Sequence, residues 1–186
     1  MRTIHRTYQD PLDLVWIRAA AEMGITVERD STVFAAWDGA GVLRIGTAET
    51  LDADDSLAQM VLHEACHALV QGPDAFHLPD WGLDSQNPAQ RVREHACLRL
   101  QAALAERYDL REFFAATTVF REYYDRLPAN PLADDGDPAV AIALAAWERA
   151  RHGPWSAPLE RALRLTSAIA NLVGEIAPRN SLWSRT

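Results

Sequence analysis

The stretch Leu57–Gln71, which reads LAQMVLHEACHALVQ, decides how this chain folds and what chemistry it can carry. Its apolar residues recur at helical spacing, and Gly72-Pro73 directly after it is a strong helix stop. We therefore expect a helix over about 56–71, with a buried face. The apolar stripe of that helix consists of Leu57, Val61, Ala65, Ala68 and Leu69, and the two histidines fall largely off it.

His63 and His67 stand four positions apart, so on a helix their side chains lie on one face about a turn apart. Two imidazoles in that arrangement can bind one metal ion. Glu64 stands beside the first histidine, where it can act as a general base toward water. Zinc polarises a carbonyl and makes a bound water far more acidic, so the pattern His-Glu-x-x-His predicts hydrolytic chemistry.

A catalytic zinc site usually has a third protein ligand. A third histidine six residues after His67 is excluded, because that position is Pro73. Glu94 is the favoured third ligand, since it stands on the next expected helix, which can fold back across the first. The residue types and spacings leave open four alternatives, namely Asp84, His77, His95 and Asp80.

The remaining sequence predicts a small sheet followed mainly by helices. Asp38-Gly39-Ala40-Gly41 is a hairpin signal between two β-type runs. Asn87-Pro88 is typical of a helix start, with an asparagine cap and a proline in the first position. Helices are expected at about 11–23, 56–71, 88–107, 110–126, 138–152 and 158–176, and strands at Ile25–Glu28, Thr32–Trp37 and Val42–Thr47.

This order of elements predicts an α+β fold that is mainly helical, with a small antiparallel sheet. We expect the run Val42–Thr47 to offer an edge to an extended peptide. The 186 residues suit a single domain. Within it we expect residues 1–108 to form the core that carries the metal site. Residues 109–186 should form a helical C-terminal part packed on that core.

Composition narrows the class of partner. The net charge is −8 and the chain has no basic cluster, which argues against nucleic-acid binding. No run of 18 apolar residues indicates a membrane span, and the N-terminus lacks the apolar stretch of a signal peptide. We therefore expect a cytoplasmic protein. Cys66 and Cys97 are the only cysteines, and we expect them to pack in the core rather than to form a disulfide.

The His63–His67 motif on a helix after a short sheet, followed by Glu94 on a later helix, resembles the gluzincin branch of the zincin-like metallopeptidases. The resemblance covers about residues 25–105. It implies a zincin-like core, His63, His67 and Glu94 as zinc ligands, Glu64 as the base, and a peptide or protein substrate. One departure is that Leu98 and Arg99 stand where the family often has an aspartate that supports the site.

A second resemblance concerns the loop after the motif helix. Gly72 followed by Asp80-Trp81-Gly82 is similar to the corresponding loop of the elongation factor P hydroxylase family. That family implies oxidative, iron-linked chemistry, and two histidines with a carboxylate also suit non-haem iron(II). The sequence therefore leaves Fe²⁺ open as an alternative to Zn²⁺.

Three functional hypotheses follow from these patterns. The first is a zinc-dependent metallohydrolase, most simply a metallopeptidase. The second is a non-haem iron hydroxylase or oxygenase acting on a protein or peptide. The third is a non-catalytic metal-binding module, which predicts that a fourth protein ligand, His77 or Cys97, closes the site.

Overall fold

Helices dominate the protein and surround one small sheet. The computed structural model describes residues 3–84, 87 and 90–184, and within them the chain is α+β and mainly helical, as expected. The helices are α1 (Pro11–Glu22), α2 (Leu57–Gln71), α3 (Arg91–Glu106), α4 (Arg121–Asp125), α5 (Ala139–His152) and α6 (Ser156–Gly174), with short 3₁₀ turns η1 (Pro73–Ala75) and η2 (Pro79–Gly82). The strands are β1 (Thr26–Asp30), β2 (Ala35–Trp37) and β3 (Val42–Gly46). None of the helices in these ranges has both the length and the apolar character that a bilayer crossing needs.

The boundaries of the first helices follow from local chemistry. Asp10 accepts a hydrogen bond from the Leu12 N–H and so caps α1, and Ser56 accepts from the Gln59 N–H at the start of α2. Gly72 ends α2 at φ 87°, a backbone conformation that favours glycine. The expected motif helix is therefore confirmed.

The sheet is mixed, so the expectation of an antiparallel sheet was wrong. The β2–β3 hairpin is antiparallel, as the Asp38–Gly41 signal predicts. β1, however, pairs with β3 rather than with β2, and since β1 and β3 run in the same direction this pair is parallel. The order β1-β3-β2 makes β3 the central strand, so the expected peptide edge at Val42–Thr47 is already paired on both sides.

Two helix predictions need correction. The helix expected over 110–126 is reduced to α4, because 113–116 are buried in succession without a helical face and β-branched residues follow at 117–119. The helix expected from 88 begins at Arg91, after a Gln90 that makes no side-chain cap. Pro88, the expected first helical residue, lies outside the described residues.

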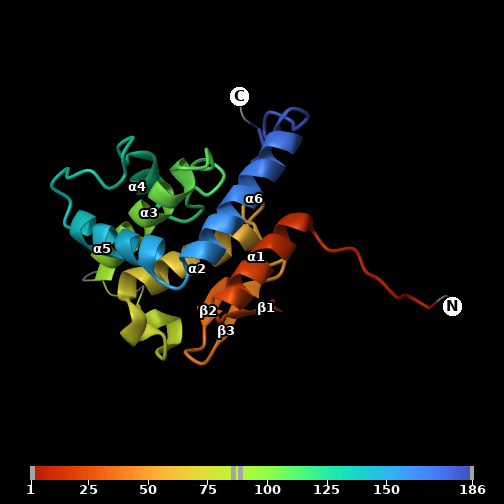
Figure 1. Ribbon diagram of the computed structural model, residues 1–186, viewed down its shortest axis with the longest axis horizontal. Helices are drawn as coiled ribbons and strands as arrows, with labels where there is room; N and C mark the ends of the chain where they lie inside the picture. Colours follow the sequence, from red (N-terminus) through yellow and green to blue (C-terminus); the bar gives the residue numbers. More distant parts are fainter. Residues whose placement is uncertain (1–2, 85–86, 88–89, 185–186) are drawn as a thin grey trace.

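The motif helix α2 lies at the centre of the fold. Figure 1 shows it running between the part formed by the sheet and α1 and the part formed by α3, α4 and α5. It packs against α1, α3 and α5. Ala65 and Ala68 on α2, and Ala143 and Ala146 on α5, are fully buried, and their small side chains let the helices approach closely. One continuous core joins α1, the sheet, α2, α3, α5 and α6.

A buried arginine on α3 anchors the loop that leads into α5. Only 2% of the Arg99 side chain is exposed. Its guanidinium donates hydrogen bonds to the Tyr123 hydroxyl, the Pro131 carbonyl, Asp135 and Asp137. The acidic loop before α5 is therefore held to α3 by ion pairs.

The same contacts lower the pKa values of the loop carboxyls. The hydrogen bond from Arg99 holds the pKa of Asp135 below its usual value. Burial acts to raise the pKa of Asp137, but hydrogen bonds from the Ala139 N–H, Tyr123 and Arg99 outweigh burial and leave this pKa lowered. Both carboxylates therefore stabilise the fold above their unfolded pKa of about 4, and this contribution is lost as the pH falls.

We predict that Arg99→Met lowers the free energy of unfolding by about 2–4 kcal/mol at pH 7. The change leaves the polar groups around this buried position without their hydrogen-bond donor. The difference between the variant and the native protein should shrink as the pH falls below about 4, where the aspartates become protonated. Urea unfolding at several pH values measures both effects.

Arg121→Met is the matched control, because Arg121 pairs with Glu112 and Asp125 on the surface. That change should cost less than about 1 kcal/mol. Equal losses in the two variants would contradict the anchoring role of Arg99.

Candidate metal centre

The two histidines of the motif converge as helical spacing predicts. The imidazole rings of His63 and His67 lie 4.5 Å apart between centroids and are almost perpendicular. Their Nε2 atoms are 3.0 Å apart. Their side chains are 22% and 7% exposed respectively, so the pair lies at the edge of the core rather than in its interior.

Glu94 reaches this pair from the neighbouring helix α3. Its Oε1 lies 3.6 Å from His63 Nε2, and its Oε2 lies 3.4 Å from His67 Nε2. Around a tetrahedral zinc with bonds of about 2.0–2.1 Å, donor atoms lie about 3.3 Å from one another. Each of these two distances is close to that spacing, and each runs to a different oxygen of the Glu94 carboxylate.

The chemistry of the donors also fits a cation. Gln101 Nε2 donates to the Phe114 carbonyl, which fixes the amide so that its oxygen lies 2.9 Å from His63 Nδ1. Since an amide oxygen only accepts, His63 carries its proton on Nδ1 and presents a lone pair at Nε2. Burial is the larger of two causes that lower the pKa of His67 well below its ordinary value, and the electrostatic effect of the neighbouring His63 is the smaller. The Nε2 atoms of the two imidazoles thus face one place, and burial disfavours the charged form of His67.

His67 has a different environment. Its Nδ1 is buried and, among the described residues, has no hydrogen-bond partner. No hydrogen bond from a described residue therefore orients the His67 ring through Nδ1. Its 3.0 Å contact with His63 Nε2 and the approach of Glu94 are the polar contacts that orient it.

Cys97 is a fourth donor near the histidines. The donor atoms of His63, His67 and Cys97 all lie within 4.8 Å of one another. The thiol, however, lies 3.8 Å from the Nδ1 side of His63 and donates to the His63 carbonyl at 3.5 Å, whereas Glu94 faces the Nε2 atoms. Burial raises the pKa of Cys97 well above its usual value. Cys97 and Glu94 therefore approach His63 at different ring nitrogens.

Glu64 is held beside the histidines by an aromatic side chain. The indole Nε1 of Trp81 donates a hydrogen bond of 2.9 Å to Glu64 Oε2. Burial raises the pKa of Glu64, and the charge of His63 and the bond from Trp81 oppose that shift without cancelling it. A carboxylate with a raised pKa is a stronger base, as proton abstraction requires.

The other candidate ligands lie in different surroundings. Asp80 accepts a hydrogen bond from the Trp37 backbone N–H, so it ties the η2 turn to the sheet. The ring of His95 stacks on Tyr123 at 3.7 Å. The backbone of His77 lies against Gly39, where a Cβ would approach the His77 carbonyl to 2.8 Å. The Asp84 N–H donates to the Gln90 side chain.

The sequence analysis missed Gln101. Gln101 follows Glu94 by seven positions, or two helical turns, and stands between the apolar residues Leu100 and Ala102. A polar residue on the buried face of α3 was the signal that could have found it.

Comparison with known proteins adds no relative: no family model, no curated protein and no solved structure matches this chain. The interpretation of the site therefore rests on its geometry.

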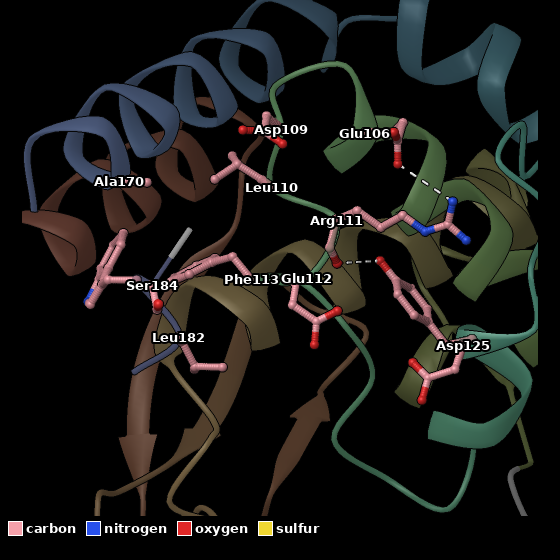
Figure 2. A pocket seen from close by; sticks show the side chains of 12 residues that line it. Glu106, Asp109, Leu110, Arg111, Glu112, Phe113, Asp125, Ala170, Leu182 and Ser184 are labelled. Carbon is pink, nitrogen blue, oxygen red and sulfur yellow. Dashed lines mark hydrogen bonds and ion pairs between the residues drawn. The ribbon is translucent and has the colours of Figure 1, made fainter. Parts of the chain in front are cut away.

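A cavity of about 500 Å³ lies elsewhere, between the end of α3 and the C-terminal residues, and Figure 2 shows its lining. Apolar side chains such as Leu110 and Phe113 form part of it. Three of its acidic side chains form ion pairs. Glu106 pairs with Arg111, as Figure 2 shows, and Glu112 and Asp125 pair with Arg121. None of the motif residues lines this cavity.

We predict that Gln101→Leu weakens zinc binding by about 10–100-fold, because His63 loses the acceptor that fixes its tautomer. Competition with a chromophoric chelator measures the affinity. Gln101→Glu keeps an acceptor and should retain affinity within about threefold of the native protein. Unchanged affinity in Gln101→Leu would show that the amide does not orient His63.

Proposed function

We propose that the protein is a small zinc-dependent hydrolase, most simply a metallopeptidase. The observation that carries this proposal is the convergence of His63 Nε2, His67 Nε2 and the Glu94 carboxylate, with Glu64 held alongside. A zincin-like arrangement of α2 and α3, of the gluzincin kind, belongs to the same proposal.

Zinc bound to these three residues would polarise the substrate carbonyl and make water easier to deprotonate at neutral pH. The residues of the chain supply the remaining steps. Glu64 takes a proton from the attacking water as the oxygen bonds to the carbonyl carbon. It then delivers that proton to the amine nitrogen as the carbon–nitrogen bond breaks. The products are a carboxylic acid and an amine.

Two features favour a catalytic site over a closed structural one. Three donors leave one position of a tetrahedral ion open, and the fourth candidate, Cys97, lies on the opposite side of the His63 ring. The partial exposure of His63 leaves the site in contact with solvent. A general base one residue from a ligand has no purpose in a site that is purely structural.

The alternative is a non-haem iron oxygenase. Two histidines and one carboxylate are also the donor set of iron(II) oxygenases. The contact between Trp81 and Glu64 favours keeping this alternative, because it brings the Asp80-Trp81-Gly82 loop into direct contact with the motif. Zinc and iron measured together, in protein purified anaerobically without added metal, distinguish the two functions.

We predict that Glu64→Gln retains one zinc per chain but lowers peptide turnover by at least about 100-fold, because the amide cannot accept the proton of water. The measurement combines metal content with hydrolysis of a mixed library of internally quenched peptides. Full turnover in this variant would rule out the proposed base.

His63→Ala should weaken zinc binding by more than about 100-fold, because it removes a donor atom. Changes to residues that only support a ligand weaken metal binding by roughly 10–100-fold. His152→Ala is the matched control, since His152 lies exposed on α5 and pairs only with Glu148 among the described residues. Stoichiometric zinc at native affinity in His63→Ala would contradict the assignment of the ligands.

A further inference from the structure

The turn that carries Trp81 has an uncommon backbone. Asp80, Trp81 and Gly82 take φ values of 46°, 57° and 71°, so three consecutive residues are left-handed. Residues with a Cβ rarely adopt this conformation, and then usually one at a time. Strained backbone persists only where surrounding contacts over-determine it.

Those contacts come mainly from the sheet. Asp80 accepts from the Trp37 N–H at 3.0 Å, and the Trp37 and Trp81 rings stack at 4.2 Å with planes 7° apart. Phe76 meets the edge of Trp81. The Trp37 indole donates to the Phe76 carbonyl. The position of Trp81 is therefore fixed by β2 and by the chain just after α2.

The two stacked tryptophans use their N–H groups differently. Trp37 bonds to a backbone carbonyl, which is the usual way to satisfy a buried indole. Trp81 bonds instead to the carboxylate of Glu64, the residue next to His63. This bond engages Oε2 and leaves Oε1 as the oxygen available to accept a proton from water.

We propose that Trp81 is a positioning residue for the hydrolysis proposed above, and that its indole N–H orients the Glu64 carboxylate toward the attacking water. The inference rests on that proposed function. It assigns a purpose to the left-handed turn, which is to bring the indole of a residue anchored on the sheet to the base on α2.

The test compares Trp81→Phe with Trp37→Phe in zinc-loaded protein. Each variant removes one indole N–H from the same stack, but only the first touches Glu64. With the internally quenched peptide library, Trp81→Phe should lower kcat by about 10–100-fold while KM and zinc affinity change less than about threefold. Trp37→Phe keeps a ring in the stack and the backbone N–H that bonds to Asp80, so it should lower kcat by a smaller factor than Trp81→Phe. Equal losses of kcat in both variants would overturn the proposal.

A double variant separates positioning from packing. In the Glu64→Gln background, Trp81→Phe should cause no further loss of kcat, because the two residues act through one group. An additional loss equal to that of the single variant would show that Trp81 acts independently of Glu64, and would also overturn the proposal.

An NMR measurement tests the contact between Trp81 and Glu64 without enzyme turnover. It needs no change at Trp81, so a Trp81 variant that fails to fold does not affect it. The Trp81 indole ¹H–¹⁵N resonance should move upfield and exchange faster in Glu64→Ala, whereas the Trp37 resonance should not. If the native protein cleaves no peptide but this shift occurs, the hydrolase proposal fails while the hold of Trp81 on Glu64 is supported. An unmoved Trp81 resonance overturns the positioning role whether or not turnover is seen.

Discussion

The approach of two imidazoles on α2 to one carboxylate on α3 is the interaction on which the rest of this structure depends. It requires the two helices to pack closely and in one register, and the fully buried alanines around α2 allow that approach. Gln101 on α3 then contacts His63, and the indole N–H of Trp81 donates to Glu64. The helix register, the tautomer of one ring and the position of the base are therefore coupled consequences of one packing arrangement.

The polar groups of α2 support a functional interpretation of that packing. Gln59, His63, His67 and Gln71 recur every fourth residue and form one polar stripe on a helix whose other residues, apart from Glu64, are apolar. Within the described part of the chain, the buried side-chain atoms without a hydrogen bond are Gln59 Oε1, His67 Nδ1 and Gln71 Nε2, all on this stripe. Buried polar atoms without partners destabilise a fold, so a chain selected for stability alone would have replaced them with apolar residues.

The sequence predicted the parts that depend on local periodicity. The ranges of α1 and α2 and the β2–β3 hairpin agree with the predictions from helical spacing and turn residues. Glu94 was favoured among five candidate ligands, and its carboxylate lies 3.6 Å from His63 and 3.4 Å from His67. The pairing of β1 with β3 was missed because strand order is a tertiary property. The helix expected over 110–126 was wrong because the buried run at 113–116 is set by packing. Gln101 was not predicted, because the family that the motif resembles often has an aspartate in this role, near positions 98 and 99.

Zinc K-edge X-ray absorption of the protein loaded with one equivalent of zinc tests most directly whether His63, His67 and Glu94 share one ion. A shared site predicts a first shell of nitrogen and oxygen at about 2.0–2.1 Å, with outer-shell scattering from two imidazoles. Removal of Glu94 should change that first shell. A sulfur neighbour at about 2.3 Å would place Cys97 on the metal, and scattering from fewer than two imidazoles would remove the shared site altogether. Either result would contradict the arrangement of His63, His67 and Glu94 around one ion.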